Sequence, residues 1–273
     1  MGRILAIANQ KGGVGKTTTT INLSASLAMK GLKILVVDMD PQGNTTSGLG
    51  VDKHNLEHDV YELLIGDCSV DDCLIPSGVD NLDIIPADVN LAGAEIELIG
   101  VDNKEYVLRD AINGLEKNYD YVIIDCPPSL SLLTINAMTT ASGVIVPVQC
   151  EFYALEGLSQ LISTIDLVSN RLNPSLSIEG IVFTMYDGRT NLSQDVVENV
   201  KASLQRAIYD SVIPRNVRLA EAPSHGLPIC TYEPRSAGAM AYENLANELL
   251  KHDRHPKADY RKREIILDRR KKK

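Results

Sequence analysis

Short, almost uninterrupted runs of apolar residues recur along the chain, separated by longer segments with a different pattern. The apolar runs lie at 3–8, 33–38, 82–86, 121–125, 143–148 and 178–185. Such runs are typical of strands buried on both faces of a parallel sheet. Spacings of three and four residues predict helices at 17–30, 89–99, 104–117, 130–141, 155–168 and 237–250. The alternation predicts an α/β fold, with a doubly wound, mostly parallel sheet flanked by helices.

A glycine-rich stretch, NQKGGVGKTT at 9–18, joins the first predicted strand to the first predicted helix. Glycines let backbone N–H groups turn inward, and a helix N-terminus adds a positive dipole, so the stretch suits the phosphates of a nucleoside triphosphate. Lys16 would reach the β- and γ-phosphates, Thr17 would bind Mg²⁺, and Thr18 would lie near the α-phosphate. The alternative is a tight turn with incidental lysines. The nucleotide-binding residues predicted here are Lys11, Gly12, Gly13, Val14, Gly15, Lys16, Thr17 and Thr18.

Aspartates stand at the ends of two predicted strands. Asp38 ends the run 33–38 and is followed by Asp40, and Asp125 ends the run 121–125. Because the carboxyl ends of parallel strands meet at one edge of the sheet, these carboxylates are expected beside the phosphates. There Asp38 and Asp125 would hold Mg²⁺ through water. The alternative is a solvated loop of capping aspartates.

The composition indicates the cellular compartment. The chain has 273 residues and five cysteines without a C-x-x-C pair, which favours a reducing cytoplasm over a disulfide framework. No apolar run approaches the roughly 20 residues of a membrane span, and a predicted core strand begins at once, which leaves no room for a signal peptide. We therefore expect a cytoplasmic protein without a membrane partner.

Charge is unevenly distributed. The net charge is −9, yet nine Lys/Arg and three Asp/Glu lie between Lys257 and Lys273. We therefore divide the chain into a nucleotide-binding domain, 1–252, and a basic C-terminal tail, 253–273. An acidic body with a basic tail suggests a polyanionic partner for the tail, and a merely solvated terminus is the alternative.

Four motifs together resemble a known family. The loop departs from G-x-x-x-x-G-K-[ST], because Gln10 stands where the first glycine belongs, and its K-G-G-x-G-K-[ST]-T form is the deviant Walker A motif of ParA/MinD ATPases. The other three motifs are DMDPQGN at 38–44, DCPPS at 125–129 and PRNVRLAEAPS at 214–224. With them, residues 1 to about 250 resemble the chromosomal ParA/Soj partition ATPases.

The resemblance implies a function. Members of this family form an ATP-dependent homodimer around two ATP molecules with Mg²⁺, and the dimer binds double-stranded DNA without sequence preference on the nucleoid. A ParB/Spo0J-type centromere-binding protein stimulates slow ATP hydrolysis, and the cycle drives chromosome or plasmid segregation. Which of the two cargoes applies is left open by the sequence.

The resemblance also implies roles for single residues. Lys11 would reach the partner subunit's nucleotide and act with Lys16 and Asp40 in catalysis, Asp40 by positioning the attacking water. Pro214 and Asn216 would lie against adenine. Arg189 and Arg218 match positions that contact DNA in the family. A role for the basic tail is a separate hypothesis, because the tail lies outside the family pattern.

Other functions remain to be weighed. A MinD-like membrane-positioning ATPase shares the deviant loop but ends in an amphipathic helix, whereas the tail here has three consecutive apolar residues, 265–267, which would point in different directions around a helix. A nucleotide-binding adaptor that barely hydrolyses ATP is a further alternative. The two loop lysines, Asp40 and Asp125 are all present, which argues against an adaptor that barely hydrolyses ATP.

Overall fold

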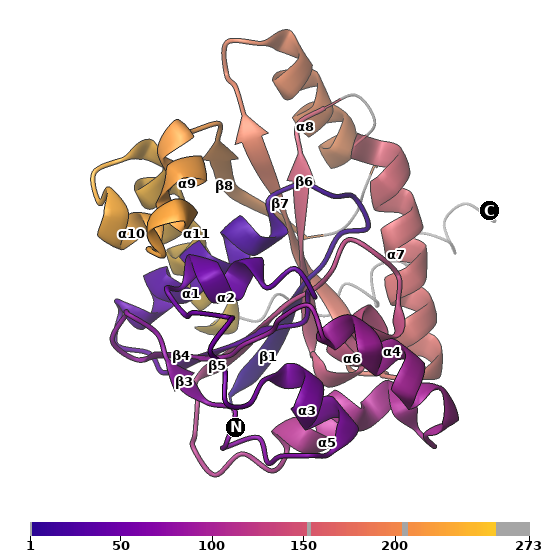
Figure 1. Ribbon diagram of the computed structural model, residues 1–273. Helices are drawn as coiled ribbons and strands as arrows, with labels where there is room; N and C mark the ends of the chain where they lie inside the picture. Colours follow the sequence, from indigo (N-terminus) through magenta and orange to yellow (C-terminus); the bar gives the residue numbers. More distant parts are fainter. Residues whose placement is uncertain (1, 152–153, 204–206, 255–273) are drawn as a thin grey trace, which may run out of the picture.

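A single mixed sheet forms the centre of the computed structural model, which describes residues 2–151, 154–203 and 207–254 (Figure 1). Within these residues the strand order is β3-β4-β2-β5-β1-β6-β7-β8, and only β3 runs antiparallel to its neighbour. This confirms the predicted doubly wound, mostly parallel sheet. The strands are β1 Arg3–Ile7, β2 Ile34–Asp38, β3 Ile75–Pro76, β4 Leu82–Ile85, β5 Tyr121–Asp125, β6 Gly143–Gln149, β7 Ser177–Tyr186 and β8 Ile208–Pro214.

Helices cover both faces of the sheet (Figure 1). One layer contains α1 Lys16–Ala28, α2 Asn44–Gly48, α9 Val217–Glu221, α10 Ile229–Tyr232 and α11 Ala237–Arg254. The opposite layer contains α3 Val60–Ile65, α4 Leu91–Glu97, α5 Val107–Ile112, α6 Leu132–Thr140, α7 Ala154–Arg171 and α8 Asn191–Ser203. Short 3₁₀ turns, η1 Leu98–Gly100, η2 Lys104–Tyr106 and η3 Ala222–His225, complete the chain.

The sheet's residues alternate between two aliphatic cores. In β1, Leu5 and Ile7 face the α1 layer, whereas Ala6 packs into the α3–α8 layer, and all three are fully buried. Burial on both faces explains the uninterrupted apolar runs. The carboxyl ends of β1, β2 and β5 lie side by side, because Ile7 and Asp38 both align with Asp125. The fold thereby brings the predicted site segments to one edge.

The predicted elements differ from the structure in several places. The helix predicted at 104–117 is wrong beyond Ile112, because the chain turns at Asn113 and Gly114 after a 3₁₀ start. Helices that were not predicted include α3, which lies in the segment 51–80 without a strong pattern, and α8, which follows the loop at 186–190. Most of the predicted basic tail, residues 255–273, lies outside the described residues.

Candidate functional site

The loop between β1 and α1 is held at its start by a buried asparagine and ends in a tight glycine turn. Asn9 donates a side-chain hydrogen bond to the Pro147 carbonyl at 2.7 Å and accepts one from the Lys11 N–H at 3.0 Å. Gly15, immediately before α1, has φ +90°, a left-handed conformation that favours glycine. The first turn of α1, with its unpaired N–H groups and positive dipole end, therefore follows directly on a tight glycine turn, a geometry suited to phosphate.

Lys16 is the buried cation of this loop. The residue is 6% exposed, and its ammonium donates to the Lys11 carbonyl at 3.1 Å. Burial lowers the pKa of Lys16, while the nearby charges of Asp125 and Asp40 oppose that shift. A buried ammonium gains most from a charged partner, so the position fits a bound polyanion.

Three threonine hydroxyls converge on Asp125 at the end of β5. Thr17 and Thr45 donate to one carboxylate oxygen at 2.8 and 2.7 Å, and Thr20 donates to the other at 3.0 Å. Asp125 is fully buried. The structure thus joins the loop, the first helix and the α2 turn at the carboxylate that was expected to hold Mg²⁺.

Asp38, at the end of β2, is held in a similar way by the next threonine. Thr46 donates to one carboxylate oxygen of Asp38 through its N–H at 2.9 Å and through its hydroxyl at 2.8 Å. The Asp40 N–H donates to the other oxygen at 3.2 Å. The Thr46 hydroxyl also accepts from the Ala87 N–H at 2.9 Å. The first turn of α2 therefore fastens the segment that carries Asp40 to the ends of β2 and β4.

Asp40 itself is nearly buried, at 8% exposed. Its Oδ1 accepts from the Gln42 N–H at 3.0 Å, and its carbonyl accepts from the Gly43 N–H at 2.8 Å. Gly43 has φ +58° and begins α2. This turn fixes the carboxylate near Lys16 and Asp125, and its charge acts to raise the pKa of both groups.

The two fully buried carboxylates fit a divalent cation. Burial raises the pKa of Asp38 to about 7, assisted by the charge of Asp125, and burial raises the pKa of Asp125 to about 6 against its three threonine donors. Carboxylate and hydroxyl oxygens are the ligands that Mg²⁺ prefers, often through water. Thr17, Asp38 and Asp125 could therefore hold Mg²⁺ here.

The raised pKa values predict a pH effect on stability in the absence of metal and nucleotide. An aspartate with a pKa near 3.8 when unfolded and about 7 when folded keeps its proton longer in the folded state. The contribution of Asp38 to the free energy of unfolding therefore falls as pH rises from about 4 to about 7. Asp38→Asn removes this loss, so its melting temperature minus that of the wild type should grow between pH 5 and 8 in EDTA. Asp67→Asn, an exposed control, should show a constant difference; the same constant difference for Asp38→Asn would contradict the prediction.

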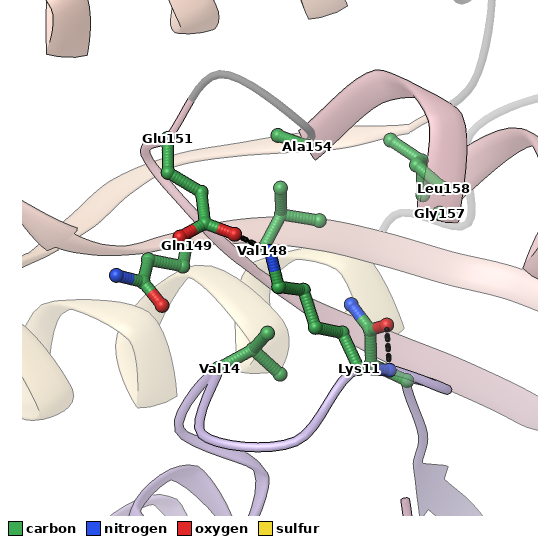
Figure 2. A pocket seen from close by; sticks show the side chains of 9 residues that line it. Lys11, Val14, Val148, Gln149, Glu151, Ala154, Gly157 and Leu158 are labelled. Carbon is green, nitrogen blue, oxygen red and sulfur yellow. Dashed lines mark hydrogen bonds and ion pairs between the residues drawn. The ribbon is translucent and has the colours of Figure 1, made fainter. Parts of the chain in front are cut away.

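Lys11 points away from its own loop. Figure 2 shows its side chain extending along a pocket between the loop and the start of α7, where its ammonium forms an ion pair with Glu151. The Lys11 side chain is 41% exposed and that of Glu151 is 29% exposed. Partly solvated ion pairs of this kind contribute little stability, so Lys11 can exchange the Glu151 carboxylate for another anion.

The two predicted DNA-contacting arginines follow neighbouring strands. Tyr186 of β7 aligns with Pro214 of β8, so the loops after them lie together. Arg189 pairs with Asp187 in a bidentate contact of 2.9 and 2.7 Å, and Arg218 pairs with Glu221 at 2.8 Å. Both guanidinium groups are largely exposed, but each is neutralised by an acidic neighbour.

Of the two residues expected against adenine, Pro214 ends β8 and Asn216 begins α9. The Asn216 side-chain carbonyl accepts from the Arg218 N–H at 2.8 Å, so this group serves as a helix cap. The segment after it packs over α1, because the Ile229 N–H donates to Asn22 at 2.7 Å. The structure thereby brings α10, which follows the motif at 214–224, beside the helix that begins in the phosphate loop.

The chain is similar in sequence to known proteins whose descriptions agree with this site. The family model described as "AAA domain" matches residues 2–178. The chain is 57% identical over 249 residues to sporulation initiation inhibitor protein Soj of Bacillus subtilis, covering 91% of this chain and 98% of that protein. It is 52% identical over 253 residues to chromosome partitioning protein ParA of Myxococcus xanthus, covering 93% and 89%. The chain belongs to the ParA/Soj family of partitioning ATPases.

A solved structure shares the fold of this ParA/Soj chain. It is described as cobyrinic acid a,c-diamide synthase from Mycobacterium smegmatis with bound ADP and magnesium. Its TM-score is 0.84 at 40% identity, and the match covers 94% of this chain and 97% of that one. The family's P-loop architecture is therefore shared with a protein that binds nucleotide and magnesium.

Several polar residues of the ParA/Soj site were missed by sequence reasoning. Asn9, Thr45 and Thr46 fix the loop and the two acidic strand ends, and Glu151 pairs with Lys11. Threonines in the first turn of a short helix beside two acidic strand ends are a usable signal for such contacts. Glu151 gave no comparable signal, because its partner lies 140 residues away in the sequence.

Proposed function

We propose that the protein is an ATP-dependent DNA-partitioning ATPase. Its ATP-bound sandwich dimer binds DNA without sequence preference and hydrolyses ATP slowly until a ParB-type partner stimulates it, which drives segregation of a chromosome or plasmid. The observation that carries the proposal is the different placement of the two lysines of one loop. Lys16 is buried beside Asp125, whereas Lys11 projects outward to a partly exposed pair with Glu151.

The proposed reaction is attack of water on the γ-phosphate of ATP, which gives ADP and phosphate. Phosphoryl transfer depends mainly on positioning and on neutralising charge. Lys16 and the amides of residues 12–18 would hold the phosphates, and bound Mg²⁺ would neutralise charge on the phosphate oxygens. Asp40 would orient the water, and Lys11 from the partner subunit would complete the site. Because the second lysine arrives only with the partner, dimer formation and hydrolysis would be coupled.

DNA binding would use the surface formed by the loops after β7 and β8. Hydrogen bonds from Arg189 lower the pKa of Asp187, and the charge of Arg215, which follows Pro214 directly, adds a small part of that shift. Exposed pairs such as Arg189–Asp187 are weak, so a phosphate could replace the carboxylate. Contacts of this kind are sensitive to salt and indifferent to sequence.

Asp187→Asn tests whether this surface contacts DNA. The change frees Arg189 and removes a negative charge, so affinity for random-sequence duplex DNA should rise about 3- to 10-fold at low salt, with a smaller gain at high salt. Arg189→Gln should weaken binding. Asp195→Asn on α8 alters the net charge equally and serves as the control in a fluorescence anisotropy titration with ATP. Equal gains for the two aspartate variants would contradict a specific role for Arg189.

The nucleotide dependence of DNA binding tests the proposed function itself. Binding to random-sequence duplex DNA is measured with ATP, with ADP and without nucleotide, with Lys16→Ala and Arg218→Glu alongside. Binding that requires ATP and disappears in both variants is expected. Equal binding in all three states would indicate that the protein binds DNA as a simple polycation. An absence of binding at low salt would overturn the proposed role in DNA partitioning.

A further inference from the structure

Two cysteines outside the nucleotide site lie in direct contact. The Sγ atoms of Cys68 and Cys73 are 3.1 Å apart, in the connection that follows α3. A disulfide bond is about 2.05 Å long, so a shift of about 1 Å would join them. No part of the proposed ATPase mechanism uses either thiol.

A hydrogen-bonded turn holds the two cysteines together. The Ser69 N–H and hydroxyl donate to the Asp72 carboxylate at 3.1 and 2.6 Å, and the Cys73 N–H donates to the Val70 carbonyl at 3.3 Å. The loop between the cysteines is therefore already closed, and little further ordering is needed to bond them.

The two thiols differ in access. Cys68 is half-buried, whereas Cys73 is fully buried, and its Sγ lies 3.3 Å from the Asp59 carbonyl at the start of α3. A reagent from solvent would reach Cys68 first. Cys73 would be protected from that reagent but placed to attack the sulfur of Cys68.

We propose that Cys68 and Cys73 form a reversible modification site that closes to an intramolecular disulfide by exchange with a small-molecule disulfide such as oxidised glutathione. The Cys68 thiolate attacks one glutathione sulfur, forms a mixed disulfide and releases one glutathione. The Cys73 thiolate then attacks the Cys68 sulfur and releases the second. In total, two electrons and two protons pass from the cysteine pair to the oxidised glutathione, which becomes two reduced molecules.

The surroundings set the rate of this exchange. Burial raises the pKa of both thiols, and the charges of Glu62 and Asp72 add to the shift at Cys68. Because the thiolate is the attacking species, exchange should be slow, over minutes to hours. The same surroundings do not stabilise the reduced thiolates, so the disulfide, once formed, should resist weak reductants.

Thiol mapping tests the proposal on the full native chain. The protein is incubated with mixtures of reduced and oxidised glutathione, quenched with acid, alkylated in denaturant and weighed by mass spectrometry. The expected result is the loss of two of five thiols, recovered by dithiothreitol. Cleavage on the amino side of aspartate separates the cysteines into peptides 67–70 and 72–79, which should appear linked.

Matched variants make the result decisive. Cys230→Ser should still lose two thiols, whereas Cys68→Ser and Cys73→Ser should not form the linked peptides. Circular dichroism checks that each variant is folded. Full alkylation of both cysteines in excess oxidised glutathione, or a lasting mixed disulfide on Cys68 beside an alkylated Cys73, would overturn the proposal.

Discussion

Replacing Lys11 by alanine should lower ATP hydrolysis by about 10³-fold or more, as loss of a cation supplied in trans does in other phosphoryl-transfer enzymes. In the structure the Lys11 ammonium lies outside its own loop and pairs with Glu151. Lys16 remains in place in the variant, so ATP binding to the single subunit should change little. The expected losses are therefore in hydrolysis and in ATP-dependent dimer formation.

The measurements separate these steps. Phosphate release gives the hydrolysis rate, equilibrium binding of a fluorescent ATP analogue gives the affinity, and light scattering gives the mass with and without ATP. Lys201→Ala, which removes an exposed lysine of α8, is the control and should behave as the wild type. A Lys11→Ala protein that hydrolyses ATP at the wild-type rate would contradict a catalytic role for this lysine.

Replacing Asp40 by alanine should lower hydrolysis by about 10²- to 10⁴-fold, the usual contribution of a group that positions or accepts a proton in the transition state. Asp40 Oδ1 accepts from the Gln42 N–H, and no residue in the described part of the chain donates to Oδ2, which could therefore orient a water molecule. Because both lysines remain, the variant should still bind ATP and dimerise. It should therefore accumulate as an ATP-bound dimer on DNA.

The test of Asp40 compares turnover with DNA retention in one preparation. Asp40→Ala should stay bound to DNA long after ATP is diluted, whereas the wild type dissociates as it hydrolyses ATP. Asp67→Ala, which removes an exposed carboxylate, should match the wild type. Loss of ATP binding in Asp40→Ala would assign the residue to nucleotide affinity and would refute its role in positioning water.

The sheet could be predicted from sequence because its strands carry their signal locally. A strand buried on both faces, such as β2, must be apolar along its length, so its terminal aspartate marks the carboxyl end of the strand, where ligands bind in open α/β sheets. The phosphate loop is equally local, since its glycines and lysine lie within one turn. These two facts sufficed to place Lys16, Asp38 and Asp125 together.

Two of the helices that were not predicted, α3 and α8, had local signals of a weaker kind. In α3, Asp59 and Glu62 form a capping box, which is visible in the sequence as an acidic residue followed three positions later by glutamate. In α8, Leu192, Val196 and Val200 repeat at intervals of four within a polar segment. Contacts such as Lys11–Glu151 had no local signal, because the pairing of β6 with β1 brings the residue after β6 beside the loop.

The central claim is that Lys11 acts on the nucleotide of the other subunit, and mixing two inactive variants tests it most directly. Lys11→Ala and Asp40→Ala are combined before ATP is added, and hydrolysis is measured. In a shared site, the Lys11→Ala subunit keeps Asp40 and receives Lys11 from its partner. The mixture should then recover hydrolysis, up to roughly a quarter of the wild-type rate. That limit applies if pairing is random, when about half of the dimers are mixed and each has one complete site, and weaker pairing of the Lys11→Ala subunit lowers it. A mixture as inactive as the separate variants would contradict action across the dimer.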